Sequence, residues 1–167
     1  LFGKEIKQTF SNFELFKIFF SSKLILLFLF KKKIIILDEP IINELLDEGK
    51  NKAIRYCHFF YPEIIENKEI VQKERILVIE KEIQSINSTN FDEYEKKRLE
   101  GENDSIICLL IRNDSVDEFI SYINELNIPL SSTINPSIFE TNEFLLDKKP
   151  SFIEYAAFYG AIRIFKY

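Results

Sequence analysis

The sequence has few of the residue types on which metal binding and nucleophilic catalysis depend. It contains one histidine, two cysteines and four glycines in 167 residues. The neighbouring Cys57 and His58 offer two zinc ligands where four are needed, and the one histidine has no acidic residue to orient it as a catalytic base. We therefore expect no metal, no cofactor and no enzymatic activity. Two distant cysteines, Cys57 and Cys108, form no disulfide framework, which indicates a reducing, cytoplasmic environment.

Long uncharged runs are also missing from the basic start of the chain. Residues 1–33 combine seven lysines with eight phenylalanines, and their longest uncharged run, residues 24–30, has seven residues. A membrane span needs about 20, and a secretory signal would be followed by small residues where Lys31 stands. Two interpretations remain open. Residues 1–33 form an interfacial segment that anchors a membrane-surface adaptor, or, as we favour, they are buried against the following helices.

Acidic residues outnumber basic ones after the first 37 residues. That segment has seven lysines and two glutamates, a balance of +5, so the net charge of −5 leaves −10 for residues 38–167. A nucleic-acid-binding surface needs a basic face to replace phosphate counterions. The acidic main body therefore argues against nucleic acid as a partner.

Helical patterns extend over most of the chain, and no strand-like alternation persists for more than a few residues, although residues 24–30 and 34–37 have strand-like composition. Asp38 caps a helix with Pro40 in its first turn, and Gly49 ends it. We predict an all-α fold. Its expected helices cover residues 10–30 (begun by Ser11 or Asn12), 38–49, 51–61 (ended by Pro62), 62–87 and 91–100 (ended by Gly101), with a linker at residues 85–90.

Residues 34–40, Ile-Ile-Ile-Leu-Asp-Glu-Pro, look like the Walker B strand of ABC-type ATPases. The resemblance implies that Asp38 holds Mg²⁺ through water and that Glu39 activates the hydrolytic water. An ATPase also needs a glycine-rich phosphate loop ending in Gly-Lys-Ser/Thr, whereas Gly3-Lys4 is followed by glutamate. Helix capping by Asp38 explains the same residues without chemistry, so an ATPase fragment is only an alternative.

Small residues gather in residues 151–167. The chain has four alanines, and three of them, Ala156, Ala157 and Ala161, lie here beside a glycine. Ser151 suits a helix cap, the Ala-Ala pair lets a second helix approach closely, and the glycine suits a left-handed turn. The pattern predicts a helical hairpin.

This hairpin resembles the core of an ankyrin repeat, whose signature runs T-P-L-H-x-A-A-x-x-G-H. Ser151 stands for the capping threonine, Ile153 for the leucine, Ala156 and Ala157 for the alanine pair, and Gly160 for the turn glycine. The proline and the two histidines of the signature are replaced by Phe152, Glu154 and Ala161.

A second, degenerate copy lies 47 positions earlier. Asp104 takes the place of the capping serine, Leu109-Leu110 that of the alanine pair and Asn113 that of the turn glycine, before a returning helix at residues 116–123. We expect residues 103–125 and 151–167 to form two antiparallel hairpins stacked in parallel orientation. Residues 127–150 would be a long inserted loop, because the ankyrin period is about 33.

Residues 101–167 as a whole resemble parasitic-protist ankyrin proteins that carry a divergent helical region before their repeats. The expected organisation is therefore a divergent helical region at residues 1–100 and degenerate plus truncated repeats at residues 101–167. The sequence contains no methionine and stops before its last helix would finish, which predicts a fragment. A stable stack needs about three repeats.

The resemblance implies a scaffold that binds another, unidentified protein. In ankyrin stacks the two positions after the alanine pair point into the concave groove, and here they are Phe158 and Tyr159, with Ile111 and Arg112 as counterparts one repeat earlier. Aromatic and arginine side chains of this kind anchor interfaces. The hairpin tip, also part of the expected site, is formed by Asp147, Lys148 and Lys149.

Overall fold

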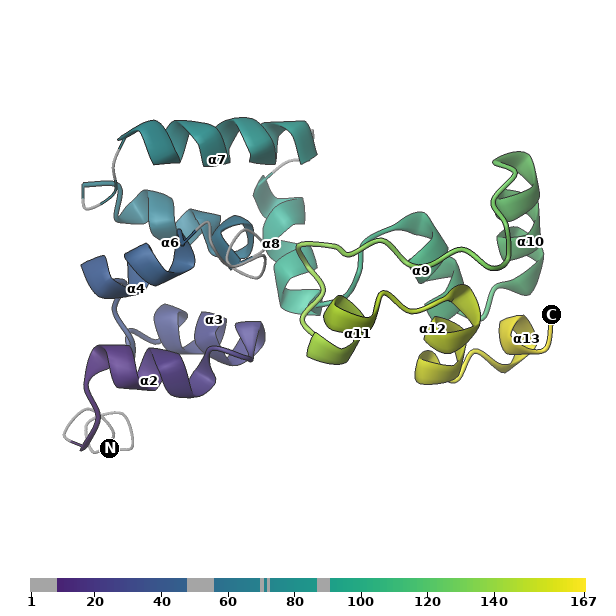
Figure 1. Cartoon of the computed structure of the whole chain (residues 1–167), viewed down its shortest axis with the longest axis horizontal. Coiled ribbons are helices and arrows are strands. Elements are labelled where there is room, and N and C mark those ends of the chain that lie inside the picture. Colours follow the sequence, from purple (N-terminus) through teal and green to yellow (C-terminus); the bar gives the residue numbers. More distant parts are fainter. Residues whose placement is uncertain (1–8, 48–55, 70, 72, 87–90) are drawn as a thin grey trace. The chain divides into compact units, whose positions relative to one another are not determined.

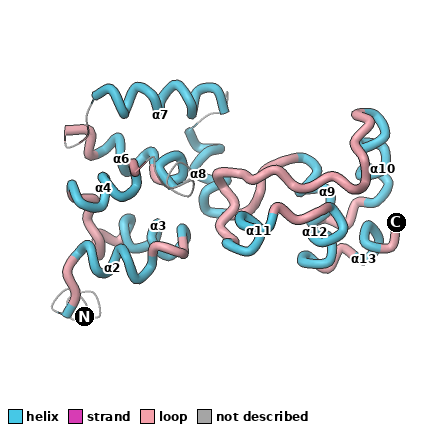
Figure 2. The backbone as a smooth tube through the Cα atoms, viewed as in Figure 1, coloured by secondary structure: helices cyan, strands magenta, loops and turns pink. Residues whose placement is uncertain are grey.

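The computed structural model describes residues 9–47, 56–69, 71, 73–86 and 91–167. These residues are predominantly helical (Figure 2). Within them the only extended pairing is an isolated antiparallel bridge between Thr133 and Ser151. The predicted all-α class is confirmed. The chain divides into two compact units, Leu1–Leu99 (unit 1) and Glu100–Tyr167 (unit 2), one residue from the expected boundary.

Short helices of unit 1 follow one another around a shared core (Figure 1). Their bounds are α2 (Asn12–Phe19), α3 (Lys23–Lys31), α4 (Glu39–Leu45), α6 (Tyr61–Glu66), α7 (Lys73–Ile86) and α8 (Phe91–Glu100). The helix expected at residues 10–30 is broken between α2 and α3, where Ser22 takes an extended conformation. Ser11 caps α2 as expected, and its hydroxyl and backbone N–H both contact Glu14 in a capping box.

Pro62 and Gly101 both lie at helix boundaries, but the helices around Pro62 differ from those predicted. Of the helix expected at residues 51–61, the described residues 56–59 are helical and the helix ends at the turn at Phe60, just before Pro62. Pro62 itself lies in the first turn of α6, where its missing N–H costs no intrahelical hydrogen bond. The helix expected at residues 62–87 is divided into α6 and α7, and α7 extends through part of the expected linker. Helix α8 ends at Gly101, with φ +69°, as predicted. Gly49 lies outside the described residues.

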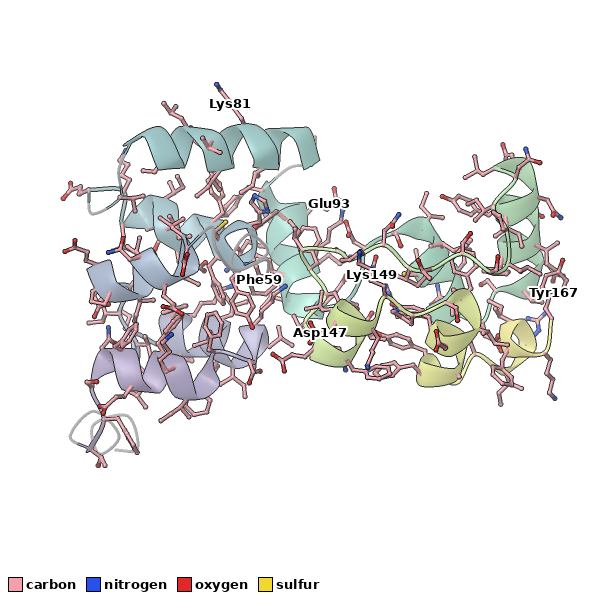
Figure 3. All side chains as sticks on the ribbon, in the orientation of Figure 1. Phe59, Lys81, Glu93, Asp147, Lys149 and Tyr167 are labelled. Atoms are coloured by element: carbon pink, nitrogen blue, oxygen red, sulfur yellow. The ribbon has the colours of Figure 1, made fainter. Side chains whose placement is uncertain are left out.

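Large aromatic side chains fill the core of unit 1. Phe16, Phe59 and Phe60 are fully buried, and Figure 3 places Phe59 among the helices while Lys81 points outward from α7. The inner side of α3 contributes Leu26 and Leu27 to this core, as the burial hypothesis expected. The outer side of α3 is exposed, at Leu24, Ile25 and Phe28.

Two helical hairpins form the framework of unit 2. Helix α9 (Ile106–Arg112) is followed by α10 (Val116–Glu125), and α12 (Phe152–Tyr159) by α13 (Ile162–Phe165), with α11 (Glu143–Lys148) between the hairpins. Helix α9 packs on α12, and α10 packs on α13. The turns also lie together, because the Asp114 carboxylate accepts hydrogen bonds from the backbone N–H groups of Arg163 and Ile164, both at 3.0 Å. The two hairpins therefore run in the same direction.

Details of the first hairpin differ from the expected register. Ser105, not Asp104, caps α9, and its hydroxyl accepts from the backbone N–H of Cys108. The left-handed residue of the turn is Asp114, with φ +51°, whereas Asn113 has φ −82°. In the second hairpin, the two alanines expected to allow a close approach differ in burial: Ala156 is fully buried and Ala157 is exposed.

Residues 127–150 are held by buried polar groups. The Glu140 carboxylate accepts hydrogen bonds from the backbone N–H groups of Asn103, Thr141 and Asn142 at 3.3, 2.9 and 2.8 Å. Asn103 in turn donates from its side-chain amide to the Asn135 carbonyl at 2.8 Å. These hydrogen bonds join the expected inserted loop to Asn103 at the start of unit 2. They also give the buried polar groups the partners that such groups need.

Candidate interaction surface

The ends of α12 are fixed by local interactions that the sequence predicts. The Ser151 hydroxyl accepts from the backbone N–H of Glu154 at 3.4 Å, and the Glu154 carboxylate accepts from the backbone N–H of Ser151 at 2.8 Å. Gly160 ends the helix with φ +69°, a conformation that residues with a side chain rarely adopt. These two ends place Phe158 and Tyr159 in the last turn of α12.

Arg112 is held inside unit 2 by several partners. Its Nη1 donates to the Asn103 carbonyl at 2.7 Å and to the Tyr155 hydroxyl at 3.0 Å, and its Nε forms an ion pair with Glu102 at 2.8 Å. Its guanidinium also lies 5.8 Å from the centre of the Tyr159 ring. Most of the donors of Arg112 are therefore used within unit 2, where the side chain holds Tyr155 and Tyr159 in place instead of facing a partner.

Tyr159 lies at the edge of this buried cluster. Its ring is half-buried, 4.8 Å from the ring of the fully buried Tyr155. Tyrosine hydroxyls are neutral near pH 7, and burial raises the pKa of Tyr159 and that of Tyr155 further. Tyr159 consequently offers part of a neutral aromatic ring to the surface.

Ile111 does not belong to this surface. It is fully buried in the core of unit 2, so the expectation that it faces a partner is wrong. Its place in the hairpin core follows from helix periodicity, since Cys108 and Ile111 are three residues apart and share the buried face of α9. The comparison with the ankyrin signature did not predict this burial. The first copy has Leu109-Leu110 where the signature has two alanines, so no pair of small residues marks the side of α9 that is covered.

Phe158 is paired with a residue that the sequence did not single out. Its ring stacks on that of Phe144 in α11, with 6.2 Å between centroids and an angle of 11°, yet Phe158 is 46% exposed and Phe144 is 54% exposed. Lys148 follows Phe144 by four residues and therefore lies on the same face of α11. The spacing of Phe144 and Lys148 could have indicated a short helix with these two residues on one face, within what was expected to be a loop at residues 127–150.

Lys148 and Lys149 are both exposed at the end of α11. Lys149 leaves the helix with φ +45°, and Figure 3 shows Asp147 and Lys149 there. We call the surface formed by Phe144, Lys148, Lys149, Phe158 and Tyr159 the aromatic ridge. Neighbouring exposed aromatic side chains are typical of protein-binding surfaces, and charged side chains such as these lysines belong to the polar rim of such a surface.

The Walker B-like segment has a structural role in unit 1. Residues 34–37 run as a loop instead of the strand that an ATPase would use. Asp38 caps α4 as predicted: its carboxylate accepts from the backbone N–H of Ile41 at 3.2 Å and from the Asn12 side-chain amide at 2.7 Å. These two contacts explain the acid without catalysis.

Neither metal-binding clusters nor membrane spans are found in the part of the chain that the structure describes. No group of three or more His, Cys, Asp or Glu side chains there is arranged to hold a metal ion. No helix there combines the length and apolar character needed to cross a bilayer.

Comparison with known proteins gives no match: no family model, curated protein or solved structure is similar to this chain.

Proposed function

We propose that this chain belongs to a non-enzymatic, intracellular scaffold of ankyrin type that binds another protein through the aromatic ridge. The packing of α9 on α12 and of α10 on α13, with the two turns joined by Asp114, supports the ankyrin interpretation. An intracellular location is supported by Cys57 and Cys108, which are buried and not disulfide-bonded.

The stacked pair Phe144–Phe158 is the observation that carries this proposal. Two large aromatic rings are exposed side by side although unit 2 has a core in which aromatic residues such as Phe119 and Phe152 are buried. Exposed aromatic pairs contribute strongly to binding when a partner removes them from water. Lys148 and Lys149 at the margin favour a partner with acidic side chains around an apolar centre.

Site-specific photo-crosslinking tests this proposal. Benzoylphenylalanine replaces Phe158 in one variant and Phe165 in the other; Phe165 is a matched control because it is 48% exposed in α13. The full-length protein should form a discrete crosslinked species in cells from position 158 and little from position 165.

A double variant then separates recognition from folding. Phe144→Ser plus Phe158→Ser should abolish capture of the crosslinked partner while helicity by circular dichroism is retained. Undiminished capture would show that the ridge is not the binding surface.

A membrane-surface adaptor is the second candidate, and one observation favours it. The exposed outer side of α3 ends beside Lys31, Lys32 and Lys33, and the Lys32 ammonium lies 5.9 Å from the centre of the Phe28 ring. An apolar strip next to lysines is typical of segments that lie on anionic membranes. Lys31, however, is already paired with Glu95 at 2.8 Å, which weakens this candidate.

A further inference from the structure

Unit 2 contains an open cleft at the end where α9 and α12 begin, whereas the aromatic ridge includes the last turn of α12. The cleft has a volume of about 670 Å³, within the range of ligand-binding pockets. Its apolar walls come from Ile107, Tyr122, Ile128 and Phe152. Its remaining lining consists of hydroxyl and amide side chains, so none of the residues that line it is charged.

One side of the cleft is formed by an extended segment, residues 131–135. This segment is paired with the start of α12, because the backbone N–H of Ile134 donates to the Pro150 carbonyl at 2.7 Å and that of Phe152 donates to the Ser132 carbonyl at 3.3 Å. These two bonds flank the antiparallel bridge between Thr133 and Ser151.

The positions of these bonds fix the direction of the Thr133 backbone. Thr133 and Ser151 form a non-hydrogen-bonded pair, in which the N–H and C=O groups of each residue point away from the partner strand. The Thr133 N–H and C=O therefore point outward from Ser151, and nothing in the described chain bonds to them. Thr133 is exposed. It thus presents one donor and one acceptor, a free edge of the kind to which an added strand binds.

We propose that this cleft binds an extended, uncharged peptide segment of another protein. One peptide residue exchanges two main-chain hydrogen bonds with Thr133, and a neighbouring apolar side chain of the peptide enters the cleft between Tyr122 and Ile128. The lack of charge in the cleft matches a neutral main chain with an apolar side chain and disfavours phosphate, nucleotide or carboxylate ligands, which need compensating cations. This site is separate from the aromatic ridge and does not depend on the proposed function of the ridge.

Selection from a library of random dodecapeptides displayed on phage, against the whole chain, supplies the probe. The enriched peptides, synthesised with blocked ends, are then titrated calorimetrically into the wild-type chain and its variants. Thr133→Pro removes the outward N–H and should weaken binding about tenfold, as expected for one lost hydrogen bond. Thr133→Val keeps the backbone and should leave affinity within about twofold.

Two further measurements keep the test decisive if Thr133→Pro lowers the melting temperature. Tyr122→Ala, which removes one wall, should also weaken binding about tenfold, whereas Tyr122→Phe should not. Methylation of the peptide's main-chain nitrogens, tested residue by residue on the wild-type chain, should abolish binding at the one residue that donates to the Thr133 carbonyl.

Other outcomes would overturn the proposal. If no peptide is enriched, or if binding survives both Thr133→Pro and main-chain methylation, the cleft is not a peptide site. If binding is lost in Phe158→Ser but not in Thr133→Pro, the peptides bind the aromatic ridge; that result would support the proposed function and reject the cleft.

Discussion

The two units use charged residues in different ways. In unit 1, the buried Arg98 and Lys23 lie on the Phe59 ring, 5.3 and 5.0 Å from its centre. Arg98 is also paired with Glu63 at 2.6 Å and with Glu95. In unit 2, carboxylates bind backbone N–H groups, as Asp114 and Glu140 do. The difference lies in what is buried: the interior of unit 1 holds an ion pair around a fully buried arginine, whereas the buried acid of unit 2, Glu140, binds backbone N–H groups, and the Arg112–Glu102 pair of unit 2 is partly exposed.

Arg98→Ala should have the largest effect on stability, and it should act on unit 1. Removing one partner of a buried ion pair leaves an uncompensated charge, which costs about 3–5 kcal/mol. Urea denaturation of the chain measures the loss. Lys97→Ala is the matched control, since Lys97 is paired with Glu93 one helical turn away at 3.2 Å on the side of α8 that is partly exposed, and a pair of this kind should change stability by no more than about 0.5 kcal/mol. Equal effects of the two substitutions would contradict a buried role for Arg98.

Glu140→Ala should destabilise unit 2 by about 1–3 kcal/mol, because the backbone N–H groups of Asn103 and Asn142 lose their acceptor, whereas that of Thr141 keeps a bond to the Gly101 carbonyl at 3.0 Å. Hydrogen exchange of the Asn103 and Asn142 amides should accelerate together, and that of Thr141 should accelerate less. Glu143→Ala, an exposed acid in the first turn of α11, is the control. Unchanged exchange in Glu140→Ala would show that other contacts order residues 127–150.

Gly160→Val should cost on the order of 1–3 kcal/mol, because a β-branched residue resists φ near +69°. The cost comes from the backbone alone, since a Cβ at this position would meet no atom within 4 Å. Gly160→Asn should cost less, because asparagine tolerates the left-handed conformation. If the melting midpoints of all three proteins coincide, the turn does not need a left-handed residue.

Asp114 should make unit 2 sensitive to acid. Partial desolvation acts to raise its pKa, but the hydrogen bonds from the Arg163 and Ile164 amides outweigh it and lower the pKa. A lowered folded-state pKa gives stability that is present at neutral pH and is lost as the pH falls below about 4. In unit 1 burial raises the pKa of Glu63, which contributes with the opposite sign.

The test measures the melting temperature of unit 2 at pH 7 and at pH 3, using the NMR amide signals of its residues as the readout. Asp114→Asn should reduce this acid dependence, and Asp117→Asn, at a more exposed acid of α10, should leave it in place. The same acid dependence in Asp114→Asn and the wild type would rule out a role for the two amide bonds.

The smallest effect is expected on membranes. The inner side of α3 is buried and Lys31 is paired, so the protein should not float with vesicles of phosphatidylcholine and phosphatidylserine. Flotation that is abolished by replacing Lys31, Lys32 and Lys33 with glutamate would instead support the membrane-surface adaptor.

The sequence by itself determined the features that depend on neighbouring residues. The caps at Asp38 and Ser151, the helix start at Ser11 (predicted as Ser11 or Asn12), the helix end at Gly101 and the left-handed turn at Gly160 were predicted correctly. The side chain and the backbone groups that it bonds are within four residues of each other in these motifs, so local chemistry is sufficient.

Only the tertiary structure decided which side of each helix is covered. Ile111 is buried although the sequence placed it on the binding surface. Ala156 is buried and Ala157 is exposed, and the sequence did not distinguish the two. Contacts distant in sequence also paired Phe144 with Phe158, positioned residues 127–150 through Glu140, and turned the Thr133 backbone outward. The reason is physical: which face is buried depends on the partner that packs against it, and no local pattern specifies that partner.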